Sequence, residues 1–124
     1  ANTMHINQTS DKAISNWQSY NIGKQEQVHY QQPNASSITL NRINPANGVS
    51  QIYGKITANG QVWLVNPAGI FFGSSAYVNV GGLLATTANI DDADFMSGKY
   101  NFKNGGLFNG SIINNGTIIA ARHG

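Results

Sequence analysis

The strongest constraint on the fold of this chain is its series of short β-prone runs, which are separated by turns rich in asparagine and glycine. Typical turns are the Asn59-Gly60 and Asn115-Gly116 steps. Asn and Gly tolerate the positive φ that tight turns require, so each such step is interpreted as a corner between two strands. The predicted strands cover residues 4–6, 27–30, 37–42, 51–57, 61–65, 69–72, 76–80, 83–87, 111–113 and 117–121.

The repetition of these corners favours a solenoid over a sandwich of hairpins. Residues 59–62 and 115–118 share an Asn-Gly corner followed by a polar and then an apolar residue, and residues 79–83 resemble residues 103–107. Such repeats are typical of coils that cannot bury their apolar side alone and must stack on the next coil. The sequence therefore predicts an all-β fold, a parallel β-helix, in which stacking satisfies the backbone hydrogen bonds.

Two segments depart from this rhythm. Residues 11–17 are the only segment with apolar residues at helical spacing, and a short helix there is considered but not favoured. Residues 90–101 contain Asp91, Asp92 and Asp94 and interrupt the alternation of strand and corner. We expect this second segment to be a loop or a small excursion from the solenoid.

The low charge of the chain narrows the range of partners. Only 10% of its residues are charged, against about a quarter in an average globular protein, and the basic residues form no run. Nucleic-acid binding is not expected, because phosphate recognition needs clustered cations. The chain has no cysteine, which excludes disulfides and thiolate metal sites. We expect no stable membrane insertion, and the signal peptide of an exported protein would be absent from this chain.

An enzyme built on a β-helix would bring acidic residues together across a groove. Here Asp91, Asp92 and Asp94 cluster in one predicted loop and lack the glycine and distal glutamate of a calcium loop. A polysaccharide-active enzyme is therefore the least favoured interpretation, and no catalytic residue, metal ligand or cofactor is assigned. Trp63, flanked by apolar residues in a predicted strand, is a candidate for stacking on a glycan if its side chain points outward.

Three blocks of sequence, in order along the chain, resemble one family. They are residues 6–23, residues 34–43 and residues 54–73, and the third block contains Asn-Pro-Ala-Gly-Ile at residues 66–70. They resemble the haemagglutination-activity, or two-partner secretion, domain of filamentous-haemagglutinin-like exoproteins, which has an Asn-Pro-Asn-Gly-Ile motif. Ala68 replaces the second asparagine of that motif, but the proline and the glycine can still define the turn.

The resemblance implies a right-handed parallel β-helix whose N-terminus is covered by a cap of extra strands. We expect a single domain over residues 1–124, with the cap at about 1–35 and the β-helix coils at about 36–124. The chain is expected to be the N-terminal part of a longer domain. The family's other motif, Asn-Pro-Asn-Leu, is not transferred, because residues 44–47 match it only loosely.

The resemblance also implies a function. Members of the family reach the periplasm in an extended state, are recognised by periplasmic POTRA domains of an outer-membrane β-barrel transporter, and fold at the cell surface. The chain is therefore expected to be the secretion-signal module of a secreted or surface-bound exoprotein. The residues expected to carry recognition lie in the matched blocks and are Asn41, Arg42, Asn59, Gly60, Asn66, Pro67, Ala68, Gly69 and Ile70.

Two further expectations concern other partners. The alternative to the secretion-signal role is a domain that is itself an adhesin and binds host glycans or receptors, with Trp63 as the stacking residue. In addition, the last coil of a truncated solenoid leaves backbone groups unpaired, and such an edge invites association. We therefore expect the isolated chain to self-associate through this end.

Overall fold

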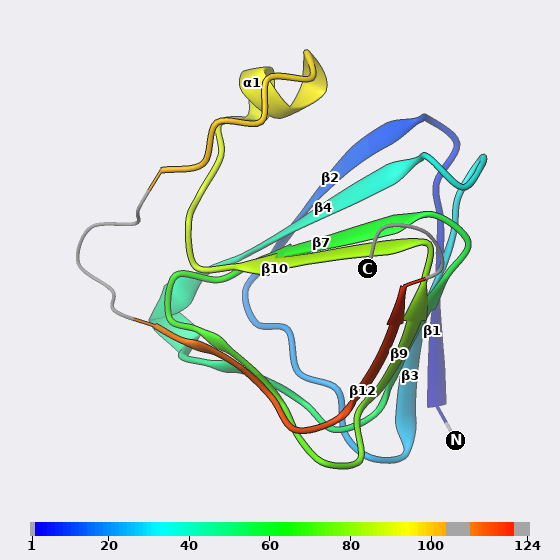
Figure 1. Ribbon diagram of the computed structural model, residues 1–124, viewed down its shortest axis with the longest axis vertical. Coiled ribbons are helices and arrows are strands. Elements are labelled where there is room, and N and C mark those ends of the chain that lie inside the picture. Colours follow the sequence, from blue (N-terminus) through cyan, green and yellow to red (C-terminus); the bar gives the residue numbers. More distant parts are fainter. Residues whose placement is uncertain (1, 104–109, 121–124) are drawn as a thin grey trace.

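The computed structural model describes residues 2–103 and 110–120, which form a three-sided parallel β-solenoid of about four turns. Figure 1 shows the strands stacked as the three walls of a triangle, with one short helix outside it. The elements in chain order are β1 (Asn2–Asn7), β2 (Lys12–Trp17), β3 (Glu26–Gln31), β4 (Ile38–Ile43), a 3₁₀ turn (Pro45–Asn47), β5 (Ser50–Ile52), β6 (Lys55–Ala58), β7 (Gln61–Val65), β8 (Ile70–Phe72), β9 (Tyr77–Val80), β10 (Gly82–Thr86), α1 (Asp92–Met96), β11 (Ile112–Asn114) and β12 (Thr117–Ala120).

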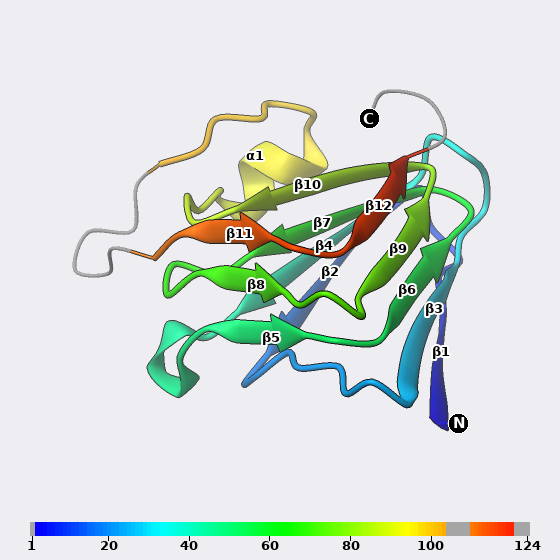
Figure 2. The same ribbon diagram turned by 60° about the horizontal axis from the view of Figure 1, so that its bottom comes forward.

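The three walls are three parallel sheets. The strand orders are β1-β3-β6-β9-β12, β10-β7-β4-β2 and β11-β8-β5, and every pairing between named strands is parallel. Consecutive strands of the chain lie in different sheets, so neighbours within a wall come from successive turns (Figure 2). In the first turn the third wall holds only a bridge between Ile22 and Ile52. The predicted parallel β-helix is confirmed.

The solenoid is right-handed. In Figure 1 the chain runs anticlockwise, and Figure 2 shows that the later turns lie on the side that faces the viewer of Figure 1. This is the hand that parallel crossover connections normally take, because strands have a right-handed twist.

The segment 11–17 contains a strand, so the alternative of a helix there is wrong. β2 pairs with β4 over its full length. The apolar residues that gave helical spacing lie on opposite faces of the strand, with Trp17 packed against the solenoid interior and Ile14 against a cluster outside it. Hydrogen bonds to the next turn therefore override the local spacing.

The predicted strand at 51–57 is divided into β5 and β6 by a corner at Tyr53 and Gly54. A Cβ at Gly54 would lie 2.2 Å from the carbonyl oxygens of both Glu26 and Gly23. The backbone of this corner thus lies directly on the corner of the preceding turn, and only glycine fits. Each of the other predicted strands overlaps an observed strand, although the end of the last one, at 121, lies outside the described residues.

The residues predicted to form an N-terminal cap belong to the solenoid itself. β1 pairs with β3, β2 with β4 and β3 with β6, all in parallel and in the same sheets as the later strands. The structure therefore places these strands in the first two turns of the coil, with β1 and β2 in the first and β3 in the second. The same strand-corner rhythm already operates from β1 onward.

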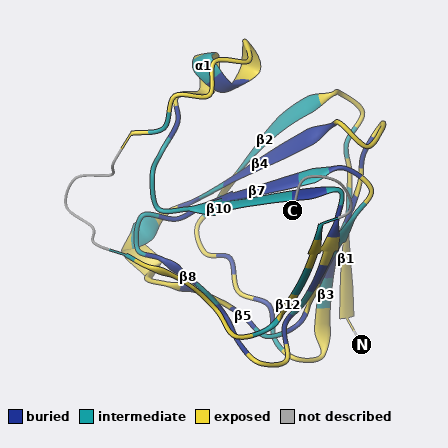
Figure 3. Ribbon diagram, viewed as in Figure 1, coloured by how far each residue is buried: buried dark blue, intermediate teal, exposed yellow. Residues whose placement is uncertain are grey.

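Apolar side chains form one cluster inside the solenoid and a smaller cluster outside it. Figure 3 shows β4 and β7 buried along most of their length. The interior cluster includes Tyr30, Ile56, Leu64, Ile70, Phe72 and Val78, all buried. The outer cluster joins Leu40 and Trp63 of the four-stranded sheet to Phe95 of α1 and to Ile90. The excursion predicted at residues 90–101 thus packs on the outer face of one wall.

No helix in the described part of the chain is long and apolar enough to cross a membrane.

The close approach of turns predicts that Gly54→Ala destabilises the domain. The added methyl group meets backbone on two sides, which cannot move without shifting a whole turn, so we expect a loss of about 1–3 kcal/mol in the free energy of unfolding. Gly82→Ala is the matched control, because its nearest neighbour is the flexible side chain of Gln61 at 3.1 Å. Urea unfolding of both variants measures the difference, and equal midpoints would contradict this account of the corner.

Candidate functional site

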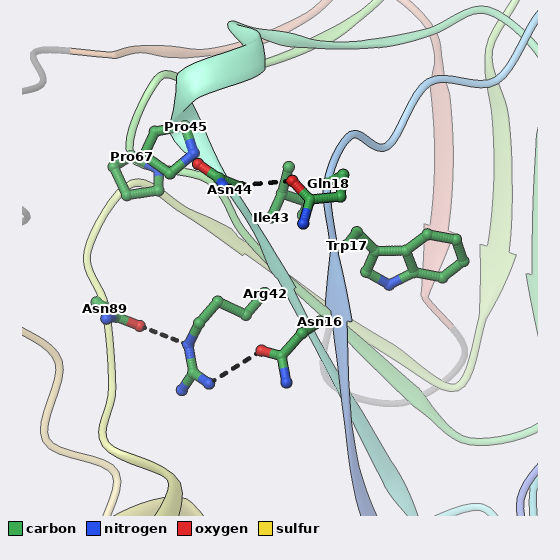
Figure 4. A pocket seen from close by; sticks show the side chains of 9 residues that line it. All are labelled: Asn16, Trp17, Gln18, Arg42, Ile43, Asn44, Pro45, Pro67 and Asn89. Carbon is green, nitrogen blue, oxygen red and sulfur yellow. Dashed lines mark hydrogen bonds between the residues drawn. The ribbon is translucent and has the colours of Figure 1, made fainter.

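Two asparagine-proline corners lie on top of each other where the four-stranded sheet meets the three-stranded sheet (Figure 4). Asn44 and Pro45 follow β4, and Asn66 and Pro67 follow β7, the strand that pairs with β4. In both corners the asparagine Oδ1 accepts a hydrogen bond of 2.9 Å from the backbone N–H two residues later. This side-chain turn is a common way for asparagine to start a bend. The loosely matching residues 44–47 therefore share the local geometry of the recognised motif.

Asn66 also joins its corner to the preceding turn. Its side chain is fully buried, and Nδ2 donates to the Gly48 carbonyl at 3.1 Å and to Ser50 Oγ at 3.0 Å. Its carbonyl accepts the N–H of Gly69 at 2.9 Å. Both polar atoms of the side chain are bonded within the chain, so a partner of the folded domain could not contact Asn66.

The other motif residues, Pro67, Ala68, Gly69 and Ile70, complete this corner. Gly69 has a φ of +114°, and a Cβ there would lie 2.8 Å from the carbonyl oxygen of Ser111 in the next turn. Both the backbone conformation and the available space therefore require glycine. Ile70 begins β8 and is buried in the interior. Ala68 supplies its backbone N–H to the turn, which forms without the asparagine that the family motif has at this position.

Asn59 and Gly60 form the corner between β6 and β7. The Asn59 amide pairs with the backbone of Gln32 in both directions, with Oδ1 accepting its N–H at 2.8 Å and Nδ2 donating to its carbonyl at 2.7 Å. The N–H of Gly60 donates to Gln32 Oε1 at 2.8 Å. A Cβ at Gly60 would lie 2.7 Å from the Ser37 carbonyl oxygen. These two residues hold neighbouring turns together.

Asn41 lies in the solenoid interior and is fully buried. Its Oδ1 accepts from Trp17 Nε1 at 3.0 Å and from the Tyr30 hydroxyl at 2.9 Å, and its Nδ2 donates to the Trp63 carbonyl at 3.1 Å. The Tyr30 hydroxyl also lies 2.8 Å from that of Tyr20. Burial raises the pKa of both tyrosines well above the ordinary value, so both hydroxyls remain neutral.

Arg42 holds the excursion against the four-stranded sheet. Its Nε donates to Asn89 Oδ1 at 3.0 Å, its Nη1 lies 2.5 Å from Asp92 Oδ1, and its Nη2 donates to the Ile90 carbonyl. Nη1 also lies 3.4 Å from Asn16 Oδ1. The guanidinium group is therefore engaged within the chain, and two of its partners, Ile90 and Asp92, come from the segment that the sequence predicted only as a loop or small excursion.

Trp63 points outward from the solenoid, as the glycan hypothesis requires, but the excursion covers it. The centroid of its ring lies 5.5 Å from that of Phe95, 4.8 Å from that of Tyr100 and 5.8 Å from that of Phe102. Only 7% of the residue is exposed. The ring therefore offers no open face on which a sugar could stack.

A pocket of about 290 Å³ lies beside the stacked corners. Figure 4 shows Arg42 directed toward Asn16 and Asn89, while the ring of Trp17 points away from Arg42. Sequence reasoning singled out Arg42 and Pro67 here, and it missed the amides because no local pattern brings them together. The lining residues are Asn16, Trp17, Gln18, Arg42, Ile43, Asn44, Pro45, Pro67 and Asn89.

Among the described residues, no group of three or more His, Asp or Glu side chains could hold a metal ion.

The two corners predict unequal effects of the same substitution. Asn66→Ala removes three side-chain hydrogen bonds and leaves the hydroxyl of buried Ser50 without the donor it has in Asn66, so we expect a loss of about 1–3 kcal/mol in the free energy of unfolding. Asn44→Ala removes the equivalent local bond at an exposed position, where the loss should be about 0.5 kcal/mol. Chemical denaturation compares the two, and a larger loss for Asn44→Ala would refute this assignment.

Comparisons with known proteins agree with this architecture. The family model of the TPS secretion domain matches residues 1–124. A heme/hemopexin-binding protein of Haemophilus influenzae is 44% identical over 102 residues, and one of its strain Rd is 37% identical over 119 residues. These matches cover 82% and 95% of this chain but only 11% and 13% of the relatives, so the chain spans about a tenth of their length.

A solved structure leads to the same family. The crystal structure of the HMW1 secretion domain from Haemophilus influenzae matches with a TM-score of 0.79 and 32% identity, covering 87% of this chain and 31% of that one. The two chains therefore share a fold over the matched residues. The match of the family model along all of the chain decides the family: the chain belongs to the two-partner secretion (TPS) domains of exoproteins, which are secretion domains and not a family of enzymes.

Proposed function

We propose that this domain is the export signal of a large exoprotein, and that the periplasmic POTRA domains of an outer-membrane β-barrel transporter recognise it before it folds. The observation that carries the proposal is the burial of the matched motif. Asn66 and Ile70 are completely buried in the folded domain, and the polar atoms of the Asn66 side chain are bonded within the chain. A transporter could read these side chains only in the extended chain.

The order of folding supports the same proposal. Every turn pairs with the turn before it, and the pairing is parallel throughout the described strands. A chain that emerges from a pore N-terminus first could therefore fold turn by turn, with each new strand pairing to an edge that is already formed. The free energy of this stacking is gained outside the transporter, which would favour outward movement of the chain.

Release of the full exoprotein in cells that carry its transporter tests the proposal. Asn66→Leu should reduce release by at least about tenfold, the factor that corresponds to a loss of 1.4 kcal/mol in binding. Asn44→Leu is the matched control, because it changes the same kind of corner at an exposed position. Binding of the urea-unfolded chain to immobilised periplasmic domains separates recognition from folding. Unchanged release and unchanged binding for Asn66→Leu would refute the role of this motif.

Ligand binding by the whole exoprotein is a separate matter. The burial of Trp63 under the excursion removes the observation that would favour glycan binding by this domain. The relatives are named for binding heme and hemopexin, but the matched regions cover only 11% and 13% of them. Binding of heme or hemopexin is therefore proposed only for a full-length exoprotein and not for this domain.

We also propose that the isolated chain of 124 residues self-associates at the end formed by β10, β11 and β12. No described strand pairs with the outer edges of these three strands. Ile112 is 39% exposed there, and Leu83 and Ile118 are only half-buried. Sedimentation velocity should show species that grow with concentration. Replacing Ile112 with lysine should shift the equilibrium toward monomer, and a purely monomeric profile of the parent chain would contradict the proposal.

A further inference from the structure

Asn41 is a buried polar residue inside the solenoid, between the polar Thr39 and the apolar Ile43 on the same face of β4. It lies in register with Ser15 of β2 and with Leu64 of β7, whose side chain belongs to the interior cluster. The adjacent Leu40 packs against the outer cluster, so the two residues point to opposite faces of β4. The amide of Asn41 is thus enclosed within the solenoid.

The amide connects three successive turns. Trp17, in β2 of the first turn, and Tyr30, in β3 of the second turn, both donate to its Oδ1 from two different walls. Its Nδ2 donates to the Trp63 carbonyl in the third turn and to the Thr39 carbonyl in its own strand at 3.3 Å. No buried side-chain nitrogen or oxygen of the described residues lacks a partner, so this network is complete.

The apolar residues of the interior specify the register between neighbouring turns less strictly than the amide of Asn41 does. A slip of two residues between neighbouring strands keeps every inward side chain inward, because side chains alternate with a period of two. Val, Ile and Leu rows would then still meet apolar neighbours. The amide of Asn41, by contrast, would lose its specific donors and acceptor. A buried amide without partners is strongly disfavoured, and a single buried asparagine fixes the register of coiled coils for the same reason.

We propose that Asn41 is the register-determining residue of the first three turns, through its hydrogen bonds to Trp17, Tyr30 and the Trp63 carbonyl. Later turns would then keep this register through backbone pairing and through corner contacts such as those of Asn66. The assignment goes beyond the export role and does not depend on it, because register is a property of the folded chain. It also gives Asn41 a task other than contact with a transporter.

Engineered disulfides report the register directly, since the chain has no cysteine of its own. Gln27 and Lys55 face each other across β3 and β6, and neighbouring positions in a sheet are close enough for a disulfide. Cysteines at 27 and 55 therefore trap the native register, whereas cysteines at 29 and 55 trap a slip of two residues. In the parent background we expect only the first pair to cross-link on mild oxidation.

The decisive variant is Tyr20→Phe/Tyr30→Phe/Asn41→Leu, which replaces most of the network by apolar groups of similar shape. The tyrosine hydroxyls and the amide are removed together, and the side-chain donor left without its acceptor is the indole N–H of the half-buried Trp17, so the urea midpoint should fall only slightly below that of the parent. Its slipped cross-link should nevertheless rise by about tenfold or more over the parent background. A triple variant that folds and gives only the native cross-link would overturn the proposal.

Two further variants distinguish a loss of register from a general loss of stability. Ile43→Ala creates a cavity at an apolar interior position of the same strand, so it should lower the urea midpoint without any slipped product. Slipped product from Ile43→Ala would mean that general destabilisation causes slippage, which would also overturn the proposal. If the triple variant does not fold, Tyr30→Phe alone decides. It removes one hydrogen bond and should give a smaller but measurable slipped fraction, and only native product would refute the assignment.

Discussion

Parallel backbone pairing between successive turns is the interaction on which the rest of this structure depends. Each wall of the solenoid is a ladder whose neighbouring strands come from different turns, so no strand can satisfy its backbone N–H and C=O groups within its own turn. Because the ladders supply these hydrogen bonds, the chain is ordered with only 10% charged residues and without cysteine. The same dependence means that each turn needs the previous one before it can form.

The corners between strands depend on specific residue types, whereas the backbone ladders do not. Backbone pairing is the same for every residue type. The corners, by contrast, need an asparagine side chain at some positions and glycine, which has no side chain, at others. Asn59 and Asn66 bind the backbone of the preceding turn, and Gly54 and Gly60 allow backbones to approach more closely than a Cβ permits. A chain that is exported and then folds in sequence needs both contributions, since the corners determine where each strand begins.

The residues that identify the family act mainly inside the molecule. Asn66, Ile70 and Asn41 are completely buried, and Arg42 is used to hold the excursion on the outer face of the four-stranded sheet. A secretion domain whose characteristic residues are hidden after folding is consistent with recognition of the extended chain. If the transporter reads these residues as proposed, the same side chains meet two demands, one from the transporter and one from the solenoid.

The sequence by itself determined the strand-corner rhythm, the solenoid, the excursion and the family, because these depend on local residue choice and on motifs that are continuous in the chain. It did not determine that residues 11–17 hold a strand, that β1 to β3 form part of the first two turns of the solenoid, or that Trp63 is covered. Nor did it bring Asn41 together with Trp17 and Tyr30, or Arg42 with Asn89 and Asp92. These features arise only when turns far apart in sequence stack, since each depends on a neighbour that the local pattern does not contain.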